Sequence, residues 1–121
     1  MANQFINKTI ENSSGAVANA WRAKQLVVNL DQNRAHVKEG GWKNGQYIAD
    51  QKGEAAPPIN WVEPDIDALV TTQEYPVGTK VADIVFDVVS ARMLSLSENP
   101  DGSGPNPFQG GVMEDIPAPT E

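Results

Sequence analysis

Hydrophobic and polar positions alternate most regularly between residues 25 and 38, a pattern typical of β-strands. Leu26, Val28 and Leu30 would lie on one face of a first strand. The polar run Asp31–Asn33 then suits a tight turn, because Asp and Asn tolerate the backbone angles of a chain reversal. The pattern therefore predicts a β-hairpin whose turn is formed by this polar run.

The second strand of this hairpin has two different faces. Ala35 and Val37 would be buried, and the positions that alternate with them are basic: Arg34, His36 and Lys38. Such alternation is typical of a strand with one face in the core and one in solvent. We therefore expect His36, the only histidine of the chain, to lie on an outward, basic face.

Further strands are expected after this hairpin. Gly40-Gly41 interrupts the second strand, and Asn44-Gly45 is the strongest short signal for a hairpin turn. Tyr47–Ala49 would be the returning strand, so residues 26–50 are predicted to form an antiparallel meander. Ile59–Val62 is another short strand candidate.

Residues 79–97 change to a helical period. Thr79 would be the N-cap, and the carboxylate of Asp83 would lie near the positive end of the helix dipole. The many β-branched residues favour a strand instead, but the period favours a helix that is either core or a subunit interface. The polar positions that define this period are three or four residues apart, at Lys80, Asp83, Asp87 and Ser90.

The two ends of the chain differ from its centre. Residues 98–121 contain five prolines, four glycines and five acidic residues but no basic residue, a composition that cannot form its own core. Residues 1–15 are rich in Asn and Ser. We expect both ends to be extended arms that become ordered along a neighbour, with a disordered tail as the alternative for residues 98–121.

Together these segments predict an α+β fold that is mainly β. It would be a small antiparallel meander or sandwich with one helix over about residues 79–97. Residues 16–24 suit either a short helix or the entry into the first strand. The predicted organisation is an N-terminal arm (1–15), one compact domain (16–97) and a C-terminal arm (98–121).

Charge and composition narrow the function classes. Net charge is −7, and it divides into +2 for residues 1–56 and −9 for residues 57–121. An acidic chain repels phosphate backbones, so nucleic acid is not expected as a partner. The absence of cysteine excludes disulfides and thiolate zinc sites. We expect no secretory signal and no membrane partner, because the sequence has neither a signal-peptide pattern nor a long apolar run.

No catalytic constellation can be assembled from the sequence. A single histidine argues against a transition-metal site, and no serine lies in a nucleophile-elbow pattern. Asp83 and Asp87 would share a helix face, for which a solvated face is the simpler interpretation. The acidic stretch with Asp65 and Asp67, and the turn at Asp101, lack the ligand spacing of a calcium loop. We therefore predict no enzyme activity and no catalytic, metal or cofactor residue.

The remaining candidates are binding residues. Aromatic side chains near turns either pack at the rim of a core or anchor an interface, and we expect one or two of them to contact another subunit. The basic face of the second strand suits an acidic neighbour, such as the tail of another copy. The predicted partner interface comprises Arg34, His36, Lys38, Trp42, Trp61, Phe108, Val112, Met113 and Ile116.

Three stretches carry a resemblance of overall plan: "LVVNLDQNRAHVKEGGWKNGQYIAD", "YPVGTKVADIVFDVVSARM" and "NPFQGGVMEDIPAPTE". The chain resembles the small accessory proteins of tailed-bacteriophage virions, such as head decoration, cement and head-fibre proteins. The resemblance implies a non-enzymatic structural protein of the virion, made in the host cytoplasm and assembled in many copies with itself and other virion proteins. Two alternatives remain, a small binding protein such as a phage-encoded inhibitor of a host enzyme, and a carboxylate-based enzyme.

Overall fold

The chain folds into one five-stranded antiparallel sheet with a helix across one face. The computed structural model describes residues 4–11, 14–71 and 73–120. The strand order is β4-β3-β2-β1-β5, which confirms the mainly-β α+β prediction. The elements are β1 (Gln4–Glu11), β2 (Val17–Asn29), β3 (Arg34–Trp42), α1 (Gly45–Ala49), β4 (Ala56–Glu63), the 3₁₀ helix η1 (Ile66–Ala68), α2 (Val81–Leu94) and β5 (Val112–Asp115).

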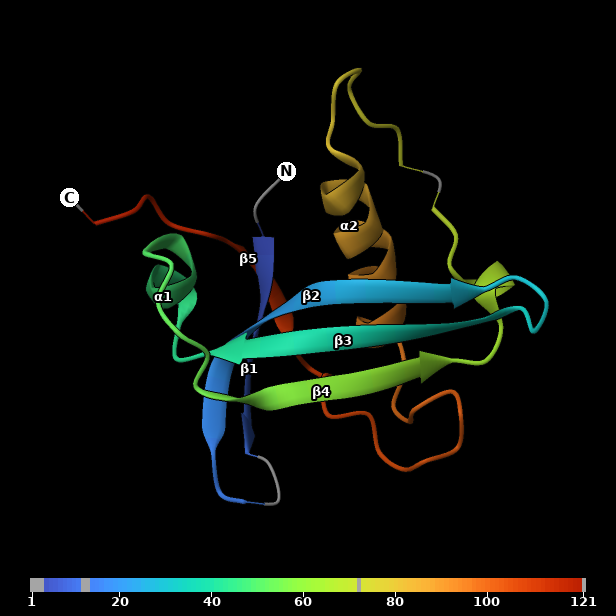
Figure 1. Cartoon of the computed structure of the whole chain (residues 1–121), viewed down its shortest axis with the longest axis horizontal. Helices are drawn as coiled ribbons and strands as arrows, with labels where there is room; N and C mark the ends of the chain where they lie inside the picture. Colours follow the sequence, from blue (N-terminus) through green and yellow to red (C-terminus); the bar gives the residue numbers. More distant parts are fainter. Residues whose placement is uncertain (1–3, 12–13, 72, 121) are drawn as a thin grey trace.

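The long strand β2 connects two parts of the sheet that run in different directions. Its beginning pairs with β1, and most of its length pairs with β3. The register with β3 shifts between Ala23 and Gln25, and Figure 1 shows β2 bending so that β1 and β5 run across the direction of β3 and β4. Bulges of this kind increase the local twist of a strand. The bend lets one sheet wrap around the core.

The core is centred on Trp21, in the first half of β2. Its side chain packs over Gly41 of β3, where a Cβ atom would lie 2.6 Å from the indole ring. Any other residue at position 41 would therefore displace the indole. Phe108 meets Trp21 edge to face, with ring centroids 5.8 Å apart. The indole N–H donates a hydrogen bond to the Lys8 carbonyl oxygen (3.0 Å), so Trp21 joins β1, β2, β3 and the segment before β5.

The predicted hairpin is confirmed as β2 and β3. Its turn is closed by a hydrogen bond from the Asn33 N–H to the Leu30 carbonyl (3.3 Å), and Asn33 has a positive φ of 54°. Asn is among the few residues that adopt this conformation at low cost. Residues 16–24, for which helix and strand were both open, belong to β2.

The predicted third strand over residues 47–49 is wrong, because Gly45–Ala49 form the helix α1. The Asn44 side chain accepts a hydrogen bond from the Tyr47 N–H (3.0 Å) and so acts as a helix N-cap instead of a hairpin residue. The strand that returns beside β3 is β4, which contains the predicted residues 59–62 and begins at Ala56.

The helix predicted over residues 79–97 is confirmed as α2. Its N-cap position is held by Lys80 and not by Thr79, whose hydroxyl donates to the Pro76 carbonyl (2.7 Å). The helix packs against the sheet through Phe86, Val89 and Met93, which belong to the same core cluster as Val37, Trp61 and Trp21.

Both terminal segments take part in the sheet, in contrast to the arms that we expected. β1 pairs with β2 and buries Phe5 and Ile6, and β5 pairs with the other side of β1. Phe108 is fully buried against Trp21. Phe5, Ile6 and Phe108 of these polar, Pro- and Gly-rich segments are thus core residues, and the compact unit extends beyond the boundaries 16–97 at both ends.

The edge-to-face contact predicts a large effect of truncating Phe108. Because Phe108→Ala leaves a cavity beside Trp21, it should lower the free energy of unfolding by about 3–5 kcal/mol, measured by urea denaturation followed by tryptophan fluorescence. Val77→Ala is the control, since Val77 is fully exposed and should change stability by less than about 0.5 kcal/mol. Equal losses of stability for the two substitutions would contradict the conclusion that Phe108 is a core residue.

Candidate functional site

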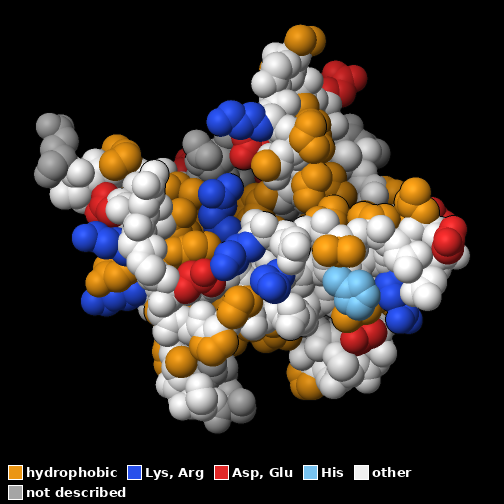
Figure 2. Space-filling view, in the orientation of Figure 1, with side chains coloured by type: hydrophobic (Ala, Val, Ile, Leu, Met, Phe, Trp, Pro, Cys, Tyr) orange, Lys and Arg blue, Asp and Glu red, His pale blue; other side chains and the backbone are white. Residues whose placement is uncertain are grey.

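The outward face of β3 carries the predicted basic residues. Arg34 and His36 are exposed and Lys38 is half-buried, whereas Ala35 and Val37 between them are buried. His36 lies between Val27 of β2 and Val62 of β4 in the strand register. Figure 2 shows the histidine beside basic side chains on the open face of the sheet.

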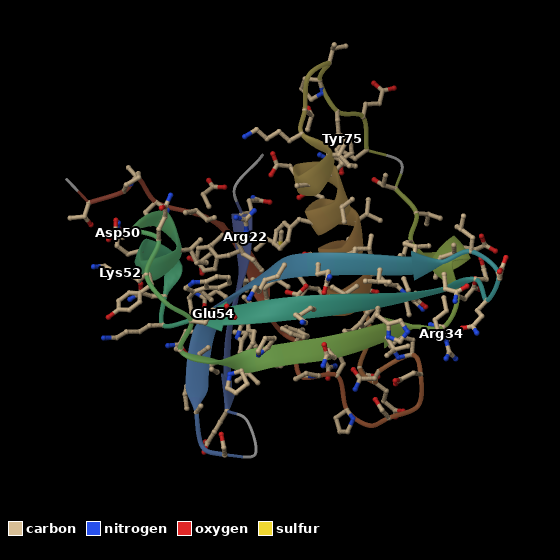
Figure 3. The ribbon with its side chains drawn as sticks, in the orientation of Figure 1. Arg22, Arg34, Asp50, Lys52, Glu54 and Tyr75 are labelled. Carbon is tan, nitrogen blue, oxygen red and sulfur yellow. The ribbon has the colours of Figure 1, made fainter. Side chains whose placement is uncertain are left out.

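An acidic residue of the same chain, Asp101, lies near the Arg34 end of this basic face. Hydrogen bonds from the Ser103 side chain and backbone lower the pKa of Asp101, and the charge of Arg34 adds to this effect. Arg34 lies at the turn end of β3 (Figure 3). Asp101 of the C-terminal part therefore lies within electrostatic reach of the basic end of β3.

Two of the predicted interface aromatics are core residues. Trp61 is 2% exposed and Phe108 is fully buried, so neither can contact another subunit in this structure, and this part of the predicted interface is corrected. Trp42 is half-buried, and its indole N–H donates to the Lys52 carbonyl (3.1 Å). The C-terminal candidates remain accessible: Val112 is exposed, and Met113 and Ile116 are half-buried.

A band of apolar side chains lies open between β2 and α2. A groove of about 200 Å³ is lined there by Leu26 of β2 and by Ala82, Val85 and Phe86 of α2, among others. Larger exposed side chains occur at the start of α2 and just after the end of β2, with Val81 at 75% exposure and Leu30 at 79%. We call the set of Leu26, Val28, Leu30, Val81, Ala82 and Val85 the apolar band. Figure 2 shows hydrophobic side chains over α2 and along the upper margin of the sheet.

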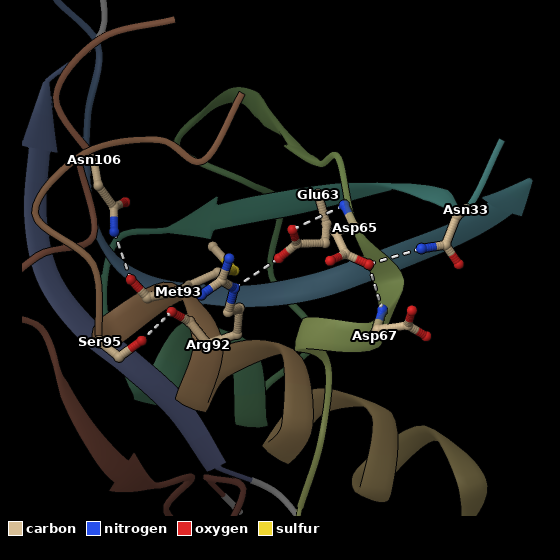
Figure 4. A network of polar contacts seen from close by, with 8 residues as sticks. All are labelled: Asn33, Glu63, Asp65, Asp67, Arg92, Met93, Ser95 and Asn106. Carbon is tan, nitrogen blue, oxygen red and sulfur yellow. Dashed lines mark hydrogen bonds and ion pairs between the residues drawn. The ribbon is translucent and has the colours of Figure 1, made fainter. Parts of the chain in front are cut away.

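An ion pair connects the sheet to the end of α2. The Arg92 Nε donates to the fully buried Glu63 carboxylate (2.7 Å), whose second oxygen accepts the Asp65 N–H (3.2 Å). Asp65 in turn accepts hydrogen bonds from the Asn33 side chain (2.7 Å) and the Asp67 N–H (3.0 Å). This network, drawn in Figure 4, fixes β4, η1, the β2–β3 turn and α2 relative to one another.

The acidic residues considered for metal binding are engaged in such local contacts. Asp65 caps η1, and Asp101 accepts the Ser103 N–H (2.9 Å) in a turn. Within the described ranges, no group of three or more histidine and carboxylate side chains is arranged to hold a metal ion.

The pair on α2 differs from the solvated face that we expected. Asp83 is buried at 7% exposure, and Asp87 is half-buried. Burial raises the pKa of Asp87, a hydrogen bond from Tyr75 opposes that shift, and the charge of Asp83 adds to it. Tyr75 lies near the N-terminal end of α2 (Figure 3).

Glu39 of β3 is a buried carboxyl that our sequence interpretation missed. It is fully buried, and neither oxygen has a hydrogen-bond partner in the described part of the chain. Burial raises the pKa of Glu39 to about 8, against the opposing charge of Arg22. The alternation of Ala35 and Val37 continues to position 39, so the two-residue period could have placed Glu39 inside.

Residues 116–120 lie along α1. The Gln46 side-chain amide donates to the Ala118 carbonyl (2.9 Å). The Thr120 N–H and hydroxyl donate to the two oxygens of Asp50 (2.6 and 2.8 Å), and these hydrogen bonds hold the pKa of Asp50 below its ordinary value. Asp50 and Lys52 lie at the α1 end of the molecule (Figure 3). Nothing in the local sequence indicates these contacts, which join residues about 70 positions apart.

Comparisons with protein-family models, with curated proteins and with solved structures found no match for this chain. Among the helices that the structure describes, none is long and apolar enough to cross a membrane.

The buried Glu39 predicts a specific pH dependence of stability. The folded chain keeps the Glu39 proton up to a pKa of about 8, whereas the unfolded chain releases it near 4.5. The folded state therefore binds more protons between these values, and the contribution of Glu39 to the free energy of unfolding falls as pH rises from 4.5 to 8. Its total is several kcal/mol at most, since each unit of pKa shift corresponds to about 1.4 kcal/mol.

Urea denaturation at pH 5 and pH 8 tests this dependence. Glu39→Gln should lose less stability than the wild type between the two pH values, because the amide does not ionise. Glu74→Gln is the control, since Glu74 is exposed and should leave the wild-type pH profile unchanged. Parallel profiles for the wild type and Glu39→Gln would refute the prediction.

Breaking the Arg92–Glu63 ion pair should cost much more stability than breaking a more exposed ion pair. Because Arg92→Met leaves the Glu63 carboxylate buried without its cation, it should lower the free energy of unfolding by about 3–5 kcal/mol. Lys24→Met breaks the more exposed Lys24–Glu54 pair and should cost about 1 kcal/mol or less. Urea denaturation measures both, and a loss for Arg92→Met no larger than the loss for Lys24→Met would contradict the account.

Proposed function

We propose that this chain is a non-catalytic structural subunit that assembles with other protein subunits, as an accessory protein of a tailed-phage particle. In this role it would decorate or stabilise the head, or serve as a head or tail accessory. Its partners would be other copies of itself and other particle proteins. The particle assignment rests on the resemblance of the chain to accessory virion proteins, and the assembly role rests on the surface described above.

The single observation that carries the assembly role is the apolar band between β2 and α2. Val28, Leu30 and Val81 are 43–79% exposed on β2, the turn after it and the start of α2. The groove between β2 and α2 is lined mainly by apolar residues, together with Lys24 and Gln25. Contiguous exposed apolar surface of this kind is typical of protein–protein interaction sites. Covering it with another subunit would remove that surface from water, which is the main favourable term in association.

The distribution of charge supports the same role. The outward face of β3 is basic, and the second half of the chain carries a charge of −9. Such asymmetry favours one orientation of neighbouring copies and accelerates their association at low ionic strength.

The two fully buried carboxyls, Glu39 and Glu63, are out of reach of a substrate. The carboxyl with the most strongly raised pKa, Glu39, is fully buried, and Glu63 is engaged by Arg92. These two groups therefore support a structural interpretation of the buried acids.

Light scattering over a range of concentrations tests the assembly role. The wild type should have a molar mass above the 13.0 kDa of one chain, and Leu30→Lys with Val81→Glu should weaken assembly about tenfold or more, because charges would be placed within a buried apolar contact. Val17→Lys is the control, since Val17 is also an exposed apolar residue (43%) but lies at the other end of β2. A wild type that stays monomeric at high concentration would overturn the assembly role.

The particle assignment has its own test. Mass spectrometry of particles purified from the culture that naturally produces the chain should detect it in a fixed, high ratio to the other particle proteins. Its absence from washed particles would contradict the assignment, even if the protein assembles alone.

A further inference from the structure

We propose that residues 112–120 are exchanged between copies, so that this tail segment of one subunit docks on β1 and α1 of a second subunit. The inference rests on the proposed assembly role and names the segment that makes the contact. The tail segment comprises β5 and the residues that lie along α1.

The first half of the docking site is the edge of β1 that β5 covers. β5 pairs with it in antiparallel register, with Ile6 opposite Met113 and Asn7 opposite Val112. Two side-chain contacts accompany the pairing: the Gln4 amide donates to Asp115 (3.2 Å), and the Asn7 amide donates to Glu114. Backbone pairing along a sheet edge recognises an added strand in the same way whether it comes from the same chain or from another.

The second half of the docking site is α1. Asp50 accepts both hydrogen bonds that Thr120 donates, and Gln46 binds the Ala118 carbonyl. These contacts hold the end of the tail segment by backbone groups and one hydroxyl.

The tail segment itself buries little. Val112 is 59% exposed, Glu114 and Asp115 are exposed, and Met113 and Ile116 are only half-buried. Between the tail and α1 lies a groove of about 330 Å³ lined by Arg22, Ile48 and Pro117, among others. Met113 packs against the core cluster, but the other residues of the tail segment are exposed or half-buried. Segments with few buried apolar contacts open at low free-energy cost.

A firm anchor and a hinge precede the tail segment. Phe108 is fully buried against Trp21, and the Asn106 side chain donates to the Met93 and Leu96 carbonyls. Gly110 follows with φ +83°, and Gly111 leads directly into β5. Gly111 is closely packed against Ile6 and Leu94, whereas only the end of the Lys8 side chain lies near Gly110. Glycine permits large backbone changes, so Gly110 is the position at which the chain can turn and release the tail segment while Phe108 stays in place.

The charges of the tail segment and its docking site are complementary. Glu114 and Asp115 are acidic, and the site carries Lys8 of β1 with Arg22 and Lys52 beside the grooves under the tail, together with one acid, Asp50, that Thr120 engages. Because a second copy offers the same site, exchange keeps all contacts of the tail segment and adds a connection between subunits. A high local concentration of copies, as in an assembled particle, favours this exchange.

Cysteine cross-linking between two variants tests the exchange, since the natural chain contains no cysteine. Asn7 and Val112 lie directly opposite each other in the β1–β5 ladder, a position that suits a disulfide. The two full-length proteins, Asn7→Cys and Val112→Cys, carry tags of different mass. They are mixed, allowed to assemble together and then oxidised. A disulfide between the two variants requires the tail segment of one copy to lie on β1 of the other.

We expect the Asn7→Cys/Val112→Cys cross-link to exceed, by about tenfold or more, the cross-link between Val112→Cys and Gly53→Cys, whose cysteine lies in an exposed loop. Equal yields of the two cross-links in a protein that light scattering shows to be oligomeric would overturn the exchange and leave the assembly role standing. Equal yields in a protein that stays monomeric would overturn both.

Discussion

The fold depends on the packing of the Trp21 indole over Gly41. This contact brings β2 and β3 together where β2 bends, and it leaves one edge of the indole for Phe108 and its N–H for the Lys8 carbonyl. A side chain at position 41 would occupy the place of the indole. Trp21, in the first half of β2, therefore holds both β1 and the segment around Phe108, so a sequence with polar, Pro- and Gly-rich ends can form one unit.

The bend in β2 also separates two surfaces with different roles. Along its second half, β2 faces α2 and forms the apolar band, which suits burial against another subunit. Beside its first half lie β1 and β5, where a mostly exposed strand is held by backbone pairing and a few polar contacts. One surface offers apolar area, and the other offers a replaceable strand. Together they allow a small chain to contact more than one neighbour without a larger core.

The parts of the fold that local sequence determines could be predicted. The hairpin follows from the alternation around Asp31–Asn33. The period of residues 79–97 predicts the helix α2 but not its buried face, which includes Asp83 and Ser90. Asn44-Gly45 was misleading, because Asn is favoured both in hairpin turns and at helix N-caps. Whether Trp61 and Phe108 lie in the core or at an interface depends on contacts between distant residues, which no local pattern contains. The tail contacts of Gln46 and Asp50 are long-range in the same way, whereas the buried position of Glu39 could have been read from the period of β3.

The most direct measurement is the sedimentation of the double variant Asn7→Cys/Val112→Cys. Oxidation in dilute solution forms its disulfide within one chain and so locks the tail segment in place. The account predicts that the locked protein sediments as a smaller species than the same protein after reduction, when both are measured at the same high concentration. A locked protein that assembles as fully as the reduced one would contradict the claim that subunits are joined by exchanged tail segments.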